Sequence, residues 1–449
     1  MMCGTRPPRD LPATVAVVGF RLGGARVTRT KILGKWMLAA AAGSLVVAAA
    51  CTPSSDDSDS GSSSGELTWA IGGAEAQPGG VDTKIVKLWN EQNPDNPVTI
   101  EVLPDEADQQ REQQANVLQA GSDEFDILGM DVIWTGEYSQ NGWLESLEDV
   151  RDQIEPGVLE GAFDSAQWEG ELWAAPFNTN AGFLYYRTDL IDQPPTTWDQ
   201  LCQMAEQAGQ QNGIGGLIGQ GRKYEGFVVN WLEYYWSAGG ELYNDDNSEV
   251  LFDTDIATQT TEFMQKAMDD GCFAPGFNTA TEEEARAAFQ TGKAVFMRNW
   301  PYAYQLIQDE GDPEVANNFD IAPLPTFSGQ GTISALGGFN NAVSAYSSNK
   351  DAAKEFVVWA STDPQVQKML ATDASVPPVL TSVYDELQNE PDMALLSKVL
   401  PDAKPRPPAP TWNTISVEMQ DALFPAYNGD ADPADASQSV ADAFNESVQ

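Results

Sequence analysis

Short apolar stretches alternate with helix-favouring segments over the first half of the folded region. Residues 67–71 are an apolar run, over residues 98–102 the apolar Val98, Ile100 and Val102 alternate with polar residues, and residues 125–130 are again an apolar run. Between the first two, apolar residues recur at positions 81, 85, 88 and 89, which lie on one face of a helix. Residues 106–120 are polar and favour a second helix. This alternation predicts an α/β fold with a parallel sheet that helices cover on both faces.

The chain is too long for a single hydrophobic core. It has 449 residues, 42% of them hydrophobic, whereas single cores stop growing at about 250–300 residues. The α/β pattern continues, with a helix expected over 281–291, a strand over 294–297 and a helix over 351–361. We therefore expect two sizeable cores and α/β structure throughout.

Charge and composition exclude several classes of function. The formal net charge is −43, which disfavours binding to nucleic acid phosphates or anionic lipid heads. The chain contains no histidine, so histidine-containing zinc sites and Ser-His-Asp triads are excluded. A neutral ligand and a partner with a basic face remain compatible, and no cofactor is expected.

The first 65 residues have the pattern of an export signal and a tether. An apolar run over 36–50 follows four basic residues and ends in Ala48-Ala49-Ala50-Cys51. The run is shorter than the ~20 residues of a membrane span. Its end resembles the bacterial lipobox, in which the cysteine is acylated, although an ordinary cleavage site is the alternative. We expect residues 1–50 to be a signal peptide and residues 51–65, rich in Ser, Asp and Gly, to be a lipid-anchored polar tether.

Two further cysteines, Cys202 and Cys272, lie beyond the tether. In an oxidising exterior, an even pair predicts a disulfide. On the chain-entropy view, a bond that closes a loop of this length stabilises a fold by about 4 kcal/mol. Two inert buried thiols are the alternative.

Six groups of residues resemble one known family in their order. They are Met130-Asp131-Val132-Ile133-Trp134 with Asn141-Gly142-Trp143-Leu144; Trp173-Ala174-Ala175-Pro176 with Asn180 and Tyr185-Tyr186-Arg187; Phe289 to Lys293 with Asn299-Trp300-Pro301-Tyr302; Ala322-Pro323-Leu324-Pro325; Leu336-Gly337-Gly338; and Asn349-Lys350 with Lys354-Glu355-Phe356. Across residues 66–410, they resemble the extracellular solute-binding proteins of carbohydrate ABC transporters. The similarity is strongest to the trehalose/maltose-binding branch, which includes actinobacterial trehalose lipoproteins.

The resemblance implies a two-lobed, periplasmic-binding-protein-like (type II) fold with hinged lobes and a ligand cleft between them. Lobe 1 is expected over 66–179 and 340–402, and lobe 2 over 180–339 and 403–449. The chain would cross between lobes near 178–182, 337–341 and 402–406.

The resemblance implies a sugar site, and three residues match its main ligand-binding positions. Asp131 follows an apolar strand, at the end where α/β folds bind ligands, and matches the family's sugar-binding acid; a helix N-cap is the alternative. Asn180 matches the family's ligand amide, or else forms a turn. Trp300 matches the family's stacking platform under a sugar ring, or else belongs to the core. Carboxylates, amides and aromatic faces are complementary to sugar hydroxyls and rings.

The other expected ligand-binding residues are more dispersed. Glu282 is chosen from the run Glu282–Glu284, which is otherwise a solvated helix start, by its spacing from Trp300. Leu336, Gly337 and Gly338 could present backbone N–H groups at the hinge. Arg406 matches a ligand arginine of the trehalose branch, and Glu75 lies in the first Gly-rich loop. The aromatic residues between Trp231 and Trp236 are expected in the core of lobe 2.

The sequence thus predicts a non-enzymatic, lipid-anchored receptor on the extracellular face of the membrane. Its expected ligand is a short neutral sugar, trehalose or a related α-glucoside disaccharide, because only Trp300 falls at a matched stacking position. A maltose/maltodextrin receptor is the alternative, and an extracellular glycosidase or an adhesion protein represents another class. The expected partners are the transmembrane subunits of an ABC permease, and the protein is expected to be a monomer.

Overall fold

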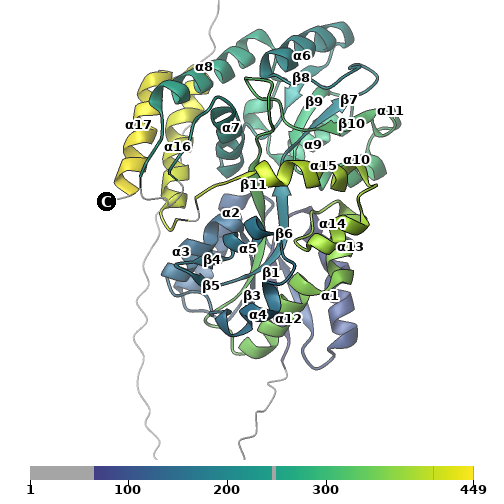
Figure 1. Cartoon of the computed structure of the whole chain (residues 1–449), viewed down its shortest axis with the longest axis vertical. Helices are drawn as coiled ribbons and strands as arrows, with labels where there is room; N and C mark the ends of the chain where they lie inside the picture. Colours follow the sequence, from purple (N-terminus) through teal and green to yellow (C-terminus); the bar gives the residue numbers. More distant parts are fainter. Residues whose placement is uncertain (1–64, 245–248, 408, 448–449) are drawn as a thin grey trace, which may run out of the picture. The chain divides into compact units, whose positions relative to one another are not determined.

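The structure is a computed structural model that describes residues 65–244, 249–407 and 409–447 (Figure 1). All of these residues belong to one compact unit, Ser60–Gln449. The expected signal peptide, Cys51 and nearly all of the tether lie outside the described residues. Within the described part, no helix is long and apolar enough to cross a bilayer.

The first sheet combines three parallel strands with antiparallel neighbours. Its order is β12-β11-β3-β1-β2, and β6 also pairs with β11. The strands are β1 Leu67–Ile71, β2 Val98–Val102, β3 Ile127–Asp131, β6 Ala175–Ala181, β11 Ala335–Val343 and β12 Lys404–Pro405. The parallel pairing of β1 with β2 and β3 confirms the local strand–helix prediction. Strand β11 pairs antiparallel with both β3 and β6.

The second sheet has the order β10-β7-β9-β8. Its strands are β7 Phe183–Arg187, β8 Gly215–Ile218, β9 Ala294–Asn299 and β10 Phe319–Ala322. Strands β8 and β9 are parallel, whereas β7 is antiparallel to both of its neighbours. A separate hairpin is formed by β4 Gln167–Trp168 and β5 Glu171–Leu172.

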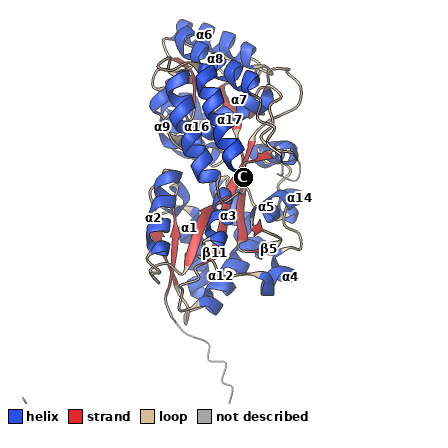
Figure 2. Ribbon diagram, turned by 90° about the vertical axis from the view of Figure 1, so that its left-hand side faces the viewer, coloured by secondary structure: helices blue, strands red, loops and turns tan. Residues whose placement is uncertain are grey.

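Helices lie on either side of the strands in both sheets (Figure 2). They are α1 Val81–Gln92, α2 Ala107–Gln119, α3 Thr135–Gln140, α4 Arg151–Ile154, α5 Glu160–Ser165, α6 Trp198–Asn212, α7 Glu225–Ser237, α8 Thr254–Asp270, α9 Glu282–Gln290, α10 Ala303–Glu310, α11 Pro313–Ala316, α12 Lys350–Thr362, α13 Pro364–Ala374, α14 Thr381–Glu386, α15 Pro391–Val399, α16 Trp412–Tyr427 and α17 Pro433–Ser447. The helices expected near 81–89, 106–120, 281–291 and 351–361 are all present.

Aromatic side chains fill the cores beside both sheets. Around the first, the Trp69 ring makes edge contacts with Phe177 and Phe356 at centroid distances of 5.4 Å. Around the second, helix α7 is buried on all sides, and Trp231 stacks on Tyr235 at 5.1 Å. The aromatic residues from Trp231 to Trp236 are buried, which confirms that they are core residues.

The predicted disulfide is present beside the second sheet. Cys202 of α6 and Cys272, just after α8, are joined, with their Cα atoms 4.7 Å apart. The Cys272 carbonyl accepts a hydrogen bond from Leu217 in β8. The disulfide joins α6 to the end of α8, and the hydrogen bond holds that end against β8 at the edge of the sheet.

Two long strands connect the sheets. Strand β6 leads directly into β7 of the second sheet, and β11 returns the chain to the first sheet beside β6 (Figure 1). In their register, Asn180 lies opposite Gly337. We call Asn180, Gly337, Gly338 and Arg406, which follows β12, the crossing residues.

Candidate functional site

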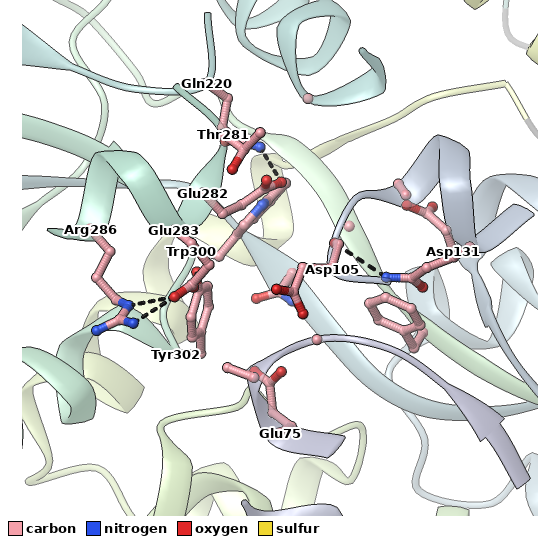
Figure 3. A pocket seen from close by; sticks show the side chains of 18 of the residues that line it. Glu75, Asp105, Asp131, Gln220, Thr281, Glu282, Glu283, Arg286, Trp300 and Tyr302 are labelled. Atoms are coloured by element: carbon pink, nitrogen blue, oxygen red, sulfur yellow. Dashed lines mark hydrogen bonds and ion pairs between the residues drawn. The ribbon is translucent and has the colours of Figure 1, made fainter. Parts of the chain in front are cut away.

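A cavity of about 550 Å³ lies between the two sheets (Figure 3). Its lining combines loops that follow β1, β2 and β3 with loops and helix starts that follow β8 and β9. Carboxyl ends of adjacent parallel strands meet at one edge of a sheet, and α/β folds bind ligands there. The volume is within the range of about 300–1,000 Å³ that small-molecule sites occupy.

Three carboxylates form what we call the first-sheet wall. Glu75 follows β1, Asp105 follows β2, and Asp131 is the last residue of β3. Because β3, β1 and β2 are neighbours in the sheet, these three positions converge on the cavity. The first-sheet wall therefore offers hydrogen-bond acceptors at the ends of three neighbouring strands.

Four side chains form the second-sheet wall. Gln220 follows β8 and Trp300 follows β9, which are parallel neighbours. Glu225 and Glu282 are the first residues of α7 and α9, where the helix N-terminus stabilises negative charge. This wall thus contributes an amide, two carboxylates and a half-buried aromatic face.

The crossing residues complete the cavity between the two walls. Gly338 has φ of 130°, which disfavours any residue with a side chain. A Cβ atom at Gly338 would lie 2.4 Å from the Asn178 carbonyl oxygen. A Cβ atom at Gly337 would lie 3.1 Å from the Trp300 ring. These glycines therefore let the crossing strands and the Trp300 ring approach one another closely.

The structure brings together eight of the nine residues expected to bind ligand. They are Glu75, Asp131, Asn180, Glu282, Trp300, Gly337, Gly338 and Arg406. Leu336 does not line the cavity and is only 7% exposed. Its side chain lies against α5 instead, where a Cβ atom at Gly161 would be 3.5 Å from Leu336 Cδ2.

Arg406 connects the two walls. Its guanidinium donates to Glu225 at 2.7 Å and to Asp131 at 3.0 Å. Burial favours loss of the proton, yet the two carboxylates raise the pKa of Arg406. Glu225 also accepts from Trp412 at 3.2 Å and from Ser416. Burial raises the pKa of Glu225 despite these partners.

Asp131 has two roles in the structure. The carboxylate oxygen that accepts from Arg406 also accepts from the Ile133 backbone N–H at 3.2 Å, as an N-cap does. Its other oxygen receives no hydrogen bond from the described residues. The structural and the ligand-binding interpretations of this residue are therefore compatible, because capping occupies only one oxygen.

Glu282 is held from two directions. Gln220 and the Tyr224 hydroxyl each donate to its carboxylate at 2.6 Å. Burial raises the pKa of this carboxyl group, although both hydrogen bonds act in the opposite direction.

The two acids that follow Glu282 have other partners. Glu283 also lines the cavity, where it binds Arg286 and accepts from Tyr302 at 2.5 Å. Glu284 instead forms a capping box with Thr281.

Three buried side-chain atoms of cavity-lining residues have no hydrogen-bond partner among the described residues. They are the Gln110 and Asn180 side-chain oxygens and the Arg406 Nε–H. Two are acceptors and one is a donor, and leaving such groups unpaired costs about 1–3 kcal/mol each. A ligand that both donates and accepts hydrogen bonds would satisfy both kinds.

Several lining residues were not predicted from the sequence, including Asp105, Gln220, Glu225 and Tyr302. Asp105 and Gln220 follow strands β2 and β8, so a search for polar residues after each strand would have found them. Glu225 carries no such signal, because its neighbours in the sequence indicate only a buried helix. Among the described residues, no group of acids or cysteines has the arrangement of a metal site.

Comparison with known proteins identifies related chains. The family described as bacterial extracellular solute-binding protein matches residues 73–367. A probable ABC transporter-binding protein of Deinococcus radiodurans is 32% identical over 366 residues, which are 77% of this chain and 85% of that protein. The maltotriose-binding protein of Pyrococcus abyssi is 25% identical over 304 residues, 65% of this chain and 63% of that protein.

A solved structure resembles most of the chain. The maltose-bound MalE3 protein of T. maritima superposes with a TM-score of 0.79 at 33% sequence identity. The match covers 85% of this chain and 99% of that one.

Proposed function

The chain belongs to the bacterial extracellular solute-binding proteins, and on that premise we propose that it is the sugar receptor of an ATP-driven importer. The similarity to a two-lobed binding protein confirms the expected α/β fold. The receptor would bind a short neutral sugar, trehalose or a related α-glucoside disaccharide. It would then present the sugar to the transmembrane subunits of its permease.

The composition of the cavity carries this proposal. Its lining combines carboxylates, the Asn180 amide, the Arg406 guanidinium and the Trp300 ring. Sugar hydroxyls both donate and accept hydrogen bonds, and sugar ring faces are apolar, so each lining group has a counterpart on the ligand. Hydrogen bonds to charged groups contribute about 1.5–3 kcal/mol each, so a handful gives micromolar affinity.

The aromatic lining favours a short ligand. Among the described residues, Trp300, Tyr302 and Phe339 are the aromatic residues of the cavity. We take Trp300 as the main stacking platform because its indole is the largest of the three aromatic faces. Relatives named for maltotriose and maltose support an α-glucoside, and a maltodextrin receptor is the alternative. Relatives named as binding proteins give no support to a glycosidase.

Calorimetry tests the proposal directly. Purified protein, from residue 52 onward, is titrated with trehalose, maltose, sucrose and longer glucans, and the sugars are analysed afterwards for hydrolysis. We expect micromolar or tighter binding of a disaccharide without turnover. Failure to bind any of these sugars would contradict the proposal, and hydrolysis would support the glycosidase instead.

We further propose hinge closure about the crossing segments. Lobe 1 would comprise residues 66–179 and 340–402, and lobe 2 residues 180–339 and 403–449. Ligand contacts on both walls would draw the lobes together, as in other hinged binding proteins. Small-angle scattering should then show a smaller radius of gyration with saturating sugar, and an unchanged radius would argue against closure.

The sequence before the fold supports a lipid anchor at Cys51 on the extracellular face. Cys51→Ser should move the protein from the membrane fraction to the medium, because the acylated residue is lost. Cys202→Ser is a control that leaves the lipobox intact. Membrane retention of the Cys51 variant would contradict the anchor without affecting the sugar-binding proposal.

A further inference from the structure

A buried ion pair lies directly behind the second-sheet wall. Arg298 in β9 donates to Glu233 in α7 through two nitrogens, at 2.8 and 2.5 Å. The two side chains are only 3% and 2% exposed. Neither residue lines the cavity.

Arg298 supports the aromatic face expected to stack on the sugar. Its guanidinium carbon lies 4.1 Å from the centroid of the Trp300 ring. A guanidinium packed on an aromatic ring is attracted by the ring's π system. Arg298 therefore covers one face of Trp300 and leaves the other for a ligand.

The same guanidinium also reaches Glu282. Its third nitrogen donates to the Gln220 side-chain oxygen, and the Gln220 amide donates onward to Glu282 at 2.6 Å. The Glu282 backbone carbonyl accepts from Asn299, the residue next to Arg298, at 2.9 Å. One buried side chain thus fixes the position of two proposed ligand groups.

Glu233 continues the network into the crossing strands. It accepts from the Ala335 backbone N–H at 3.1 Å and from the Ser334 hydroxyl at 3.3 Å, where β11 begins. Ser334 in turn accepts from the backbone N–H of Gly182, between β6 and β7, at 2.5 Å. A Cβ atom at Gly182 would lie 2.6 Å from Arg298.

We propose that Arg298 is a positioning residue that fixes Trp300 and Glu282 against the crossing strands, so that sugar binding depends on it without direct contact. The inference rests on the proposed function. Replacing a buried ion pair by apolar residues is often neutral or stabilising, so stability alone gives little reason for a pair here. Positioning gives a reason for the pair, because the planar guanidinium contacts Glu233, Gln220 and the Trp300 ring at the same time.

The test is Arg298→Lys, studied with trehalose and maltose as probes. Lysine keeps the charge opposite Glu233, but it cannot lie flat under Trp300 and also reach Gln220. We expect sugar affinity to fall at least tenfold while the melting temperature of the sugar-free protein stays within a few degrees of wild type. Arg187→Lys is the matched control. Arg187 is also buried and binds Asp189 through two nitrogens, but it lies at the end of β7 away from the cavity.

A double-mutant cycle with Trp300→Ala separates positioning from a general effect. Because Arg298 also holds Glu282 through Gln220, Arg298→Lys should still lower affinity when Trp300 is already absent, but by a clearly smaller factor than in the wild-type background. Two results would overturn the proposal: wild-type affinity in folded Arg298→Lys, or an equal loss of affinity whether or not Trp300 is present.

If Arg298→Lys does not fold, Glu233→Gln takes its place with the same expectation. Failure of both variants to fold would make the pair a folding element and overturn the proposal too. A wild-type protein that binds neither sugar would instead refute the proposed function.

Discussion

The two walls of the cavity occupy equivalent positions, at the carboxyl ends of parallel strands, yet their side chains are held very differently. On the second-sheet wall, Glu282 accepts two side-chain hydrogen bonds, and Trp300 rests on Arg298. On the first-sheet wall, neither Glu75 nor Asp105 forms an ion pair with any described residue. Asp131 is paired only with Arg406, which comes from a crossing segment.

The difference suggests a division of roles. Side chains held by a second layer of contacts need little reorganisation when a ligand arrives, which favours affinity and a defined orientation. Unpaired carboxylates keep acceptor sites free for hydroxyl groups. We therefore expect the second-sheet wall to set the position of the sugar and the first-sheet wall to add bonds on closure.

The disulfide gives the largest test of this contrast, because it lies beside the second sheet alone. Replacing both Cys202 and Cys272 by serine should lower the free energy of unfolding by about 4 kcal/mol, since the unfolded chain regains the freedom of a long loop. Chemical denaturation measures the loss. Hydrogen exchange should place the lost protection in α6, α8 and β8, and leave β1 to β3 nearly unchanged.

Peptide mapping provides the control for that experiment. Non-reducing mass spectrometry of exported wild-type protein should show Cys202 and Cys272 in one crosslinked peptide. Two thiols that alkylate freely, or protection lost equally around both sheets, would contradict the predicted contrast.

Asp131→Ala tests the first-sheet wall. The change deletes one or two charge-assisted hydroxyl bonds of about 1.5–3 kcal/mol each, so sugar affinity should fall roughly ten- to several-hundredfold. It also removes the N-cap of a short helical turn and one partner of Arg406. Stability should therefore fall as well, by about 0.5–2 kcal/mol for the cap alone. Calorimetry and melting curves on the same variant measure both losses.

Asp131→Asn separates the two roles of this residue. Asparagine can still cap the turn through its oxygen, so most of the stability lost in the alanine variant should return. The charge-assisted bonds should remain lost, and affinity should stay well below wild type. An Asp131→Ala protein that is destabilised but binds sugar normally would show that this carboxylate is purely structural.

The sequence predicted residues of the candidate site where local patterns determine their position. Asp131 and Trp300 follow apolar strands, and a side chain at the end of a parallel strand must lie at the binding edge. The glycine at position 338 indicated a backbone conformation that a residue with a side chain rarely adopts, and Gly338 does have a positive φ. Leu336, expected beside the two glycines, does not line the cavity, because its side chain packs near Gly161 of α5, a contact that only the folded chain shows.

Contacts between distant segments were beyond the sequence. Glu225 meets Arg406 across 181 positions of the chain, and Glu233 meets Arg298 across 65. Neither pair has a signature in its local sequence, because both depend on how helix α7 packs. The antiparallel pairing of β11 with β3 could not be predicted for the same reason, because the two strands are far apart in the sequence.

The smallest expected effect is the share of the pH dependence that Glu75 and Asp108 contribute on the first-sheet side. Partial burial raises the pKa of Glu75 to about 7, and Glu283 and Asp105 add to the rise while Arg286 opposes it. Burial also raises the pKa of Asp108 in α2 to about 7, and Glu225 and Glu106 add to this rise. Gln420, which donates to Asp108 at 3.3 Å, acts in the opposite direction.

Between about pH 4.5 and 7, the folded protein therefore holds protons that the unfolded chain has released, and its stability should fall as pH rises through this range. After allowance for solvent screening, we expect Glu75 and Asp108 together to contribute on the order of 1–2 kcal/mol. Melting temperatures of the sugar-free protein at pH 5 and pH 8 measure how steeply stability falls with pH. This slope should be shallower in the double variant Glu75→Gln/Asp108→Asn.

Glu284→Gln is the control from the second-sheet side, because the capping contacts of Glu284 lower its pKa even though burial acts in the opposite direction. It should change stability without changing the slope. Equal slopes in wild type and the double variant would show that Glu75 and Asp108 do not hold these protons.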